Sequence, residues 1–226
     1  MSKRIAILGA SQGIGAALVD HFAQIGDTEV LALSRNLQKM QQRFLQKNVK
    51  CYGLDISKDV QDQINALNLD APIDILINNA GLLINKPFTY LTHQDFTESY
   101  QVNVIGIMEA TQALLPALAP NAHIVNISSM GGFQGSLKFA GLAAYSTSKA
   151  ALCAFTELFA EEYKATGIHM NCLCLGAVQT EMLAAAFPGY IAPTSASQMA
   201  HFIADFALNS GAFFNGKIIP VSSSNP

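Results

Sequence analysis

The chain has 226 residues, of which 50% are hydrophobic and 13% are charged, and its formal net charge is −3. This length suits one α/β domain with a full core, so we expect a single domain over residues 1–226. About 25% of a typical soluble protein is charged, so the low share here predicts a covered surface, most simply a subunit interface. No run of Lys and Arg exceeds two residues, which argues against a nucleic-acid partner.

The N-terminal residues imitate a signal peptide, because Lys3 and Arg4 precede an apolar run. That run is too short, and glycines break it from Gly9 onward. No segment reaches the roughly 18 apolar residues of a membrane span. We therefore expect a cytoplasmic protein with no membrane partner. The cysteines lack metal or redox spacing, so the sequence predicts buried thiols and no metal site; they are Cys51, Cys153, Cys172 and Cys174.

Strand-like and helical patterns alternate along the chain. The predicted strands are residues 4–8, 30–33, 49–54, 73–77, 122–127, 168–175 and 217–221. The main predicted helices run to residue 25 with a stop at Gly26, and over 94–115, 145–165 and 197–208. This alternation predicts an α/β fold in which a doubly wound parallel sheet of about seven strands carries helices on both faces.

A glycine-rich turn, Gly9, Gly13 and Gly15, lies between the first strand and the first helix. Glycines there permit a tight turn and a close approach of a pyrophosphate, which then faces the helix N-terminus. Such turns also occur without nucleotides, but the position between strand and helix favours a dinucleotide site. The residues predicted to form it are Gly9, Ser11, Gln12, Gly13, Ile14 and Gly15.

The second strand ends in Ser34, Arg35 and Asn36. A site for NAD usually places an acidic residue here to bind the ribose hydroxyls. A guanidinium can instead bind a 2′-phosphate, so NADP(H) is favoured and NAD(H) is possible. The alternative is an arginine exposed to solvent in the loop that enters the next helix.

Two later strand ends can complete the cofactor site. Asp55 and Ile56 follow the third strand, where the carboxylate could accept from an adenine amine or cap the next helix. Asn79, Ala80 and Gly81 follow the fourth strand, where amides and small residues can form a cofactor wall or a plain turn.

Tyr145 and Lys149 are four residues apart on a predicted helix, so their side chains share one face. An ammonium about 4 Å from a phenol favours the phenolate by about 4 kcal/mol at an effective dielectric constant of about 20. This corresponds to about three pK units, so we expect Lys149 to bring the pKa of Tyr145 near the working pH. The alternative is an ordinary pair on a helix surface.

Ser129 follows the apolar run 122–127, where a strand end borders the ligand crevice and a hydroxyl can donate to a substrate oxygen. Asn103 lies in the middle of a predicted helix. Because an unpaired buried amide is destabilising, it is either a satisfied core amide or a functional, water-binding position.

The ordered set of glycine turn, Asn-Asn-Ala-Gly, mid-helix Asn, Ser-Ser and Tyr-x-x-x-Lys resembles the short-chain dehydrogenase/reductase family from residue 5 to about 221. The resemblance implies a Rossmann-like fold. It also implies that Tyr145 is the general acid/base, that Ser129 polarises a carbonyl, and that Lys149 binds the nicotinamide ribose. Asn103 would anchor a water linked to Lys149. Gly176, Val178 and Thr180 would line the nicotinamide side.

Several positions depart from the family pattern. Leu8 and Leu175 replace a usual Thr and Pro, and the chain after Val221 lacks an Asp-Gly-Gly ending. Residues 135–141 form an extra segment that can shape the substrate mouth, whereas the substrate loop, residues 182–196, is short. Apolar residues near this mouth favour an apolar carbonyl substrate or a packed lid: Met130, Phe133, Leu183, Phe187 and Tyr190.

The sequence thus predicts an NADP(H)-dependent oxidoreductase that transfers a hydride between nicotinamide and a small-molecule carbonyl or secondary alcohol. The alternative is a non-catalytic NADP(H)-binding sensor or partner subunit on the same fold, although such a protein needs no proton relay. A serine hydrolase is disfavoured because no G-x-S-x-G elbow is present. Helices 94–115 and 145–165 carry apolar residues on several faces, and members of the family commonly pair these helices between subunits. We therefore predict a homodimer or homotetramer.

Overall fold

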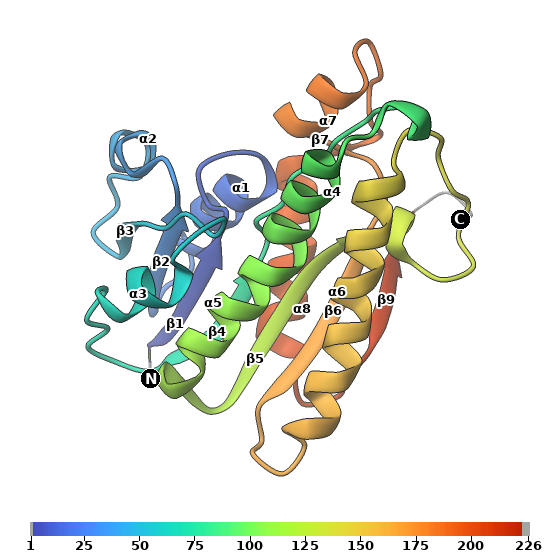
Figure 1. The fold of residues 1–226 in the computed structure, drawn as a ribbon. Helices are drawn as coiled ribbons and strands as arrows, with labels where there is room; N and C mark the ends of the chain where they lie inside the picture. Colours follow the sequence, from blue (N-terminus) through green and yellow to red (C-terminus); the bar gives the residue numbers. More distant parts are fainter. Residues whose placement is uncertain (1, 223–226) are drawn as a thin grey trace.

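The computed structural model describes residues 2–222, and its main sheet has seven parallel strands in the order β3–β2–β1–β4–β5–β6–β9 (Figure 1). These strands are β1 (Lys3–Leu8), β2 (Thr28–Ser34), β3 (Val49–Gly53), β4 (Ile73–Asn78), β5 (Leu118–Ser129), β6 (His169–Leu175) and β9 (Ile218–Val221). The main helices are α1 (Gly13–Phe22), α2 (Leu37–Arg43), α3 (Val60–Asn65), α4 (His93–Tyr100), α5 (Gly106–Leu114), α6 (Ala143–Glu162), α7 (Glu181–Ala186) and α8 (Ala196–Asn209). The predicted fold class is confirmed.

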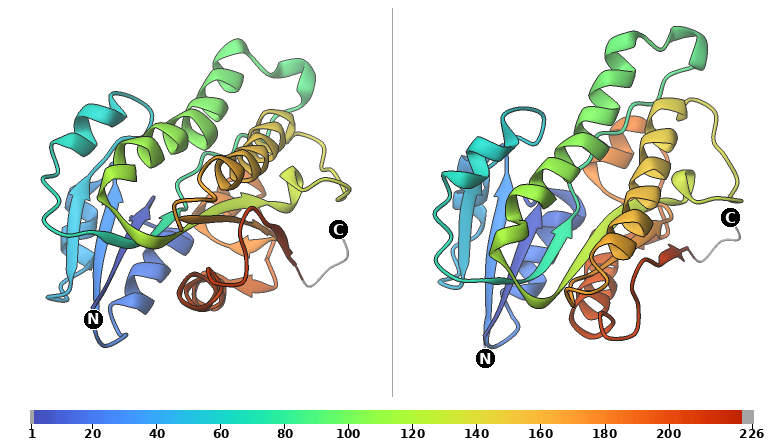
Figure 2. Two further views of the ribbon diagram at one scale, coloured as in Figure 1. Left: turned by 90° about the horizontal axis from the view of Figure 1, so that it is seen from below. Right: turned by 60° about the horizontal axis from the view of Figure 1, so that its bottom comes forward.

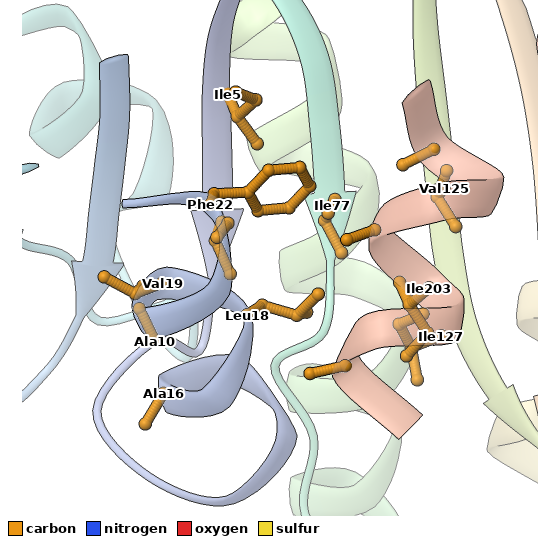
Figure 3. Close-up of a cluster of buried hydrophobic side chains, with 14 of the residues drawn as sticks. Ile5, Ala10, Ala16, Leu18, Val19, Phe22, Ile77, Val125, Ile127 and Ile203 are labelled. Carbon is orange, nitrogen blue, oxygen red and sulfur yellow. The ribbon is translucent and has the colours of Figure 1, made fainter. Parts of the chain in front are cut away.

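Alternate residues of each strand face opposite layers, as the two-residue period of a strand requires. Ile5 and Ile7 of β1 pack with α1 and α8, whereas Ala6 and Leu8 pack with α3, α5 and α6. Figure 2 shows these helix sets on the two sides of the sheet. In Figure 3, Phe22 of α1 lies between β1 and β4. Both faces are covered, which explains the nearly continuous apolar strands.

The winding of the sheet reverses at β1, which pairs with β2 on one side and with β4 on the other. In open α/β sheets a ligand binds at such a reversal, outside the carboxyl ends of the strands. Every segment predicted to bind the cofactor follows one of these strand ends, so the topology gathers them at one edge.

The long helix predicted over 94–115 is present but not regular. It begins with a capping box of Thr92 and Asp95 in α4, passes through a π-helical turn at η2 (Gln101–Ile105), and continues as α5. At Gly106 a Cβ atom would lie 1.9 Å from the carbonyl oxygen of Ile56. Only glycine allows this close packing, and the π turn is a common feature of functional sites.

One predicted helix end and one predicted loop differ from the structure. Helix α1 ends at Phe22 rather than near Ile25, because the Thr28 hydroxyl donates to the carbonyls of both residues and satisfies the helix end. The segment 182–196 is not only a loop. Thr180 accepts from the Leu183 amide and caps α7, while β7 (Val178–Gln179) pairs with β8 (Thr194–Ser195) at its base.

The layer of α5 and α6 leaves apolar side chains exposed. Ile105 and Met108 are 43% and 41% exposed, and Leu158 of α6 is 70% exposed. Leu114, Leu152 and Phe159 lie on the faces of these helices that pack into the core. No helix within the described residues is long and apolar enough to span a membrane. The stretch after Val221 that departs from the family pattern lies largely outside the described residues.

We expect this apolar layer to pair with a second copy of the chain, because exposed apolar patches in this position favour burial. Light scattering at micromolar concentration should give a dimer or tetramer mass. Leu158→Glu should shift the mass toward the monomer, whereas Leu45→Glu should not, although Leu45 is 81% exposed on another part of the surface. A monomer mass for the wild-type protein would contradict this expectation.

Candidate active site

A cavity of about 610 Å³ opens along the carboxyl edge of the sheet. Its wall includes most residues predicted to bind cofactor or substrate. They are Gly9, Ser11, Gln12, Gly13, Ile14, Ser34, Arg35, Asp55, Ile56, Asn79, Ala80, Gly81, Ser129, Tyr145, Lys149, Gly176, Val178 and Thr180. Residues from six strand ends and from the start of α6 therefore converge on one site.

Three predicted site residues do not line this cavity. Asn36 is the N-cap of α2, where its side chain accepts from the Lys39 amide. Gly15 lies behind the turn, and Asn103 lies behind Lys149. The side chains of Asn36 and Asn103 are used within the protein, so any part they have in the site is indirect.

The glycine turn is held tightly against the end of β4. Gly9 has a φ of +80°, and a Cβ there would lie 2.6 Å from Cα of Ala80. A Cβ on Gly15 would lie 2.1 Å from the Gly9 carbonyl oxygen, which accepts from Nδ2 of Asn79 at 3.1 Å. Larger residues at these positions would push the turn and the strand end apart.

The start of α1 suits an anion. Its N-cap residue, Gln12, makes no side-chain cap, and the first turn contains no acidic residue. The first amides of α1 therefore begin at the cavity wall without a capping side chain, as a phosphate site requires. Ser34 donates to Ser11 at 2.9 Å and joins the end of β2 to this turn. These features fit a dinucleotide phosphate.

Arg35 and Asp55 lie near one another on the adenosine side of this cavity. Burial alone would raise the pKa of Asp55, but hydrogen bonds from Ser57 and the charge of Arg35 hold it below its usual value. The predicted alternative role of Asp55 as a helix cap is wrong. Asp59 is the N-cap of α3, and the Asp55 carboxylate accepts from the Ser57 amide and hydroxyl at 3.0 and 2.6 Å.

The proposed catalytic side chains meet where β5 ends and α6 begins. Tyr145 and Ser129 interact at this point, and the Ser129 hydroxyl oxygen accepts from the Gly131 amide at 3.1 Å. Lys149 is 4% exposed, and its Nζ donates to the Ile127 carbonyl at 2.9 Å. The pair is therefore not an ordinary surface pair: both groups belong to the cavity wall.

The expected lowering of the pKa of Tyr145 by Lys149 is wrong for this structure. Burial raises the pKa of Tyr145, and the hydrogen bond with Ser129 offsets this only in part. Burial also lowers the pKa of Lys149 to about 8. Removal from water therefore disfavours both charged forms and outweighs the attraction that the four-residue spacing suggested.

Asn103 is a satisfied core amide. Its Oδ1 accepts from the Leu82 amide at 2.7 Å, and its Nδ2 donates to the Leu82 carbonyl and to Ser148 at 2.9 Å. Because Ser148 precedes Lys149 on α6, Asn103 joins the π turn, the loop after β4 and the catalytic helix. It lies beside Gly81, whose Cβ would come within 3.4 Å of Lys149 Nζ.

The loop after β6 forms the part of the wall that the sequence predicts will face the nicotinamide. Thr180 caps α7, and its methyl carbon would lie 3.3 Å from a Cβ on Gly13. Leu175 lines the cavity although it replaces the family's usual proline.

The outer part of the cavity is apolar and was only partly predicted. Met130, Leu183, Phe187 and Tyr190 line it as expected, but Phe133 does not and packs on Cys153 and its neighbours instead. Leu137 and Phe139 of the predicted extra segment 135–141 also line it, and Leu142 was missed. The extra length between Ser129 and Tyr145 was the signal for them, since an inserted segment must pass over the strand end.

The comparisons with known proteins agree with this geometry. A family model described as short chain dehydrogenase matches residues 3–190. The 3-oxoacyl-[acyl-carrier-protein] reductase of Aquifex aeolicus (strain VF5) is 31% identical over 188 residues, which cover 79% of this chain and 75% of the relative.

Solved structures show the same fold. A short chain dehydrogenase from Burkholderia cenocepacia J2315 in complex with NADP has a TM-score of 0.85 at 24% identity, over 98% of this chain and 97% of that chain. A 3-ketoacyl-(acyl-carrier-protein) reductase from Brucella melitensis complexed with NADH has a TM-score of 0.84 at 23% identity, over 97% and 96%.

A dinucleotide-type cavity with a tyrosine and a lysine at its wall defines a class of oxidoreductases that act on CH–OH or C=O groups. The chain belongs to the short chain dehydrogenase family. Members of this family use a nicotinamide dinucleotide, and the uncapped start of α1 and the glycine turn have a geometry that fits its phosphates.

The lowered pKa of Lys149 makes a prediction about stability. Below about pH 8 both folded and unfolded chains carry the charge, and burial of Lys149 destabilises the fold. Between about pH 8 and 10.5 the folded chain releases this proton first, so stability rises with pH. Urea unfolding measures this effect. Between pH 7 and 10.5 the free energy of unfolding of the wild type should rise by up to about 3 kcal/mol relative to that of Lys149→Met.

Lys164→Met is a matched control, because Lys164 is 65% exposed just beyond α6. Its difference from wild type should stay nearly constant over this pH range. A difference between wild type and Lys149→Met that is flat, or that moves in favour of the methionine variant, would show that Lys149 keeps an ordinary pKa in the folded protein.

Proposed function

We propose that this protein is an NADP(H)-dependent reductase of small carbonyl compounds, with Tyr145 as its general acid. The observation that carries this proposal is that Ser129, Tyr145 and buried Lys149 lie together on the cavity wall, with Lys149 one turn beyond Tyr145 along α6. The cofactor, when bound, supplies the hydride that reaches the carbonyl carbon. All other steps belong to side chains of this chain.

Ser129 positions the substrate by donating a hydrogen bond to its carbonyl oxygen, and Tyr145 then gives a proton to the same oxygen. A raised pKa keeps Tyr145 protonated at neutral pH, which is the form that a proton donor needs. The geometry therefore supports the reductive direction. Lys149 contributes its buried charge and a ribose contact, and we assign Asn103 the indirect role of holding the α6 turn through Ser148.

The main alternative is a sensor that binds NADP(H) without reacting. A sensor has no need of a buried lysine next to a tyrosine and a serine. The fold keeps such a lysine buried only with the help of several hydrogen bonds. The two proposals differ in one measurement. A panel of carbonyls and alcohols, read by NADPH absorbance, should show turnover for the reductase and only binding for the sensor.

The substrate class follows from the outer cavity. Leu137 and Phe139 face it from the extra segment and Leu142 from the start of α6, whereas Leu183, Phe187 and Tyr190 face it from α7 and its loop. Such a lining favours a substrate whose carbonyl reaches Ser129 while an apolar portion lies between these two segments. In the panel, aryl and medium-chain alkyl ketones should therefore react better than short polar ones.

Tyr145→Phe tests the general acid. The ring and its packing remain, but the proton donor is lost, so turnover should fall by about 10²-fold or more. Steady-state kinetics with the best panel substrate measures this. Tyr163→Phe is the control, since Tyr163 stacks on Phe159 at the far end of α6. Near-normal turnover of Tyr145→Phe, with unchanged cofactor affinity, would rule out this role.

Cofactor preference rests on Arg35. Leu33, Ser34, Arg35 and Asn36 include no carboxylate that would repel a phosphate, and Ser34 lines the cavity beside Arg35. Asp55 is near Arg35, which moderates the positive potential. Gln12 also stands in the glycine turn without a charge. These features support a moderate preference for NADP(H) rather than a strict one.

Arg35→Ala tests this preference. A charge-assisted contact contributes about 1.5–3 kcal/mol, so wild type should bind NADPH about tenfold to a hundredfold more tightly than NADH. The alanine variant should lose most of this difference and keep its NADH affinity, as measured by calorimetric titration. Arg43→Ala is the control, because Arg43 pairs with Asp20 on α1. Equal affinities in wild type would mean that Arg35 serves only as a surface charge.

A further inference from the structure

Three cysteines from α6 and β6 lie together between this helix and the sheet. Cys172 and Cys174 are two residues apart on β6, so both side chains point to the same face of the sheet, and Cys153 of α6 packs against them. The Sγ atom of Cys153 lies 3.9 Å from that of Cys172 and 3.6 Å from that of Cys174. All three sulfurs lie within 4.8 Å of one another.

A fourth polar atom borders these sulfurs. The Ser128 hydroxyl oxygen is 3.6 Å from Sγ of Cys153 and also interacts with Cys174. This hydroxyl donates to the Lys149 carbonyl at 2.9 Å, so its hydrogen is used and its lone pairs face the thiols. The four atoms form a compact S₃O donor set from three elements: β5, β6 and α6.

We propose that Cys153, Cys172, Cys174 and Ser128 form a binding site for a thiophilic divalent cation of the Zn²⁺ class. A metal bound about 2.3 Å from each sulfur in a tetrahedral site holds the sulfurs about 3.8 Å apart. The two separations from Cys153 lie on either side of that value and the third is within 4.8 Å, so only the Cys172 and Cys174 sulfurs need to move relative to each other, by about 1 Å at most. Soft thiolates select such cations over Mg²⁺ or Ca²⁺.

Charge also fits a divalent ion. Binding converts three thiols to thiolates and releases three protons, which leaves a net charge of −1 on the metal and its three sulfurs. The ammonium of Lys149 interacts electrostatically with each of these cysteines and can balance that charge within the interior. A monovalent ion would leave a larger unbalanced charge in the same place.

A disulfide is the competing chemistry of this cluster. It would bring two sulfurs from at least 3.6 Å to about 2.05 Å and would leave the third thiol unused. The cation uses all three thiols at nearly their present positions. Cys153 is 8% exposed, which provides a side from which an ion can enter.

The experiment uses the full-length protein, reduced and freed of metal, titrated with Cd²⁺. Wild type should show an ultraviolet thiolate-to-cadmium charge-transfer band that saturates at one ion per chain, with release of three protons and a raised melting temperature. Cys153→Ala should weaken binding at least about 100-fold. Cys174→Ala is a second variant and should weaken binding in the same way. Melting curves should be recorded for each variant to check that it is folded.

Cys51→Ala is the matched control, because Cys51 lies on β3 outside this cluster. It should keep the full band. A wild-type band no stronger than that of Cys153→Ala, or a band lost in Cys51→Ala, would overturn the proposal. So would a protein that loses two thiols to a reducible disulfide in air and then fails to bind Cd²⁺ after full reduction.

Discussion

The burial of one cation, Lys149, constrains the rest of the site. An ammonium removed from water loses hydration worth several kcal/mol, and only fixed hydrogen bonds and charges can offset that loss. Here Nζ donates to the Ile127 carbonyl, while the Lys149 carbonyl accepts from the Ser128 hydroxyl. Its neighbour Ser148 accepts from Asn103. The end of β5, the π turn and α6 must therefore keep one arrangement for the lysine to remain inside.

A second, fully buried hydrogen-bond network between β4, β5, α5 and α6 supports that arrangement. Asn78 of β4 donates to Asn126 of β5 at 2.8 Å and to Thr111 of α5 at 3.1 Å. Asn126 in turn donates to Thr156 of α6 at 2.8 Å. Buried amides are stable only when their partners are correctly placed, so this network selects one register of the two helices on the two strands. It thereby aligns the strand end at Ser129 with the helix start at Tyr145.

The features predictable from sequence were those encoded locally. Apolar runs and glycines marked the strand ends, so nearly all proposed wall residues converge as expected. The misses depend on contacts between distant segments. The pKa of Tyr145 depends on burial, which residue spacing does not report. Cys153 meets Cys172 and Cys174 only because α6 packs on β6. Asp55 is the exception, because it bonds locally to Ser57 and the N-cap position of α3 falls four residues later, at Asp59.

The two halves of the cavity differ in what fixes them, and this difference bears on specificity. The cofactor half consists of strand ends tied directly to the sheet. The substrate half consists of α7 and the extra segment 135–141, which a single loop joins: Asn85 donates to the Ala186 carbonyl at 2.8 Å, and the Lys86 amide donates to the Gly141 carbonyl at 2.9 Å. Gly141 has a φ of +86°, and a Cβ there would lie 2.1 Å from Oδ1 of Asn85. Side chains that line the substrate half can therefore vary without disturbing the sheet, provided that this loop contact is kept. Changes at Asn85 or Gly141 would displace both segments of the substrate half together.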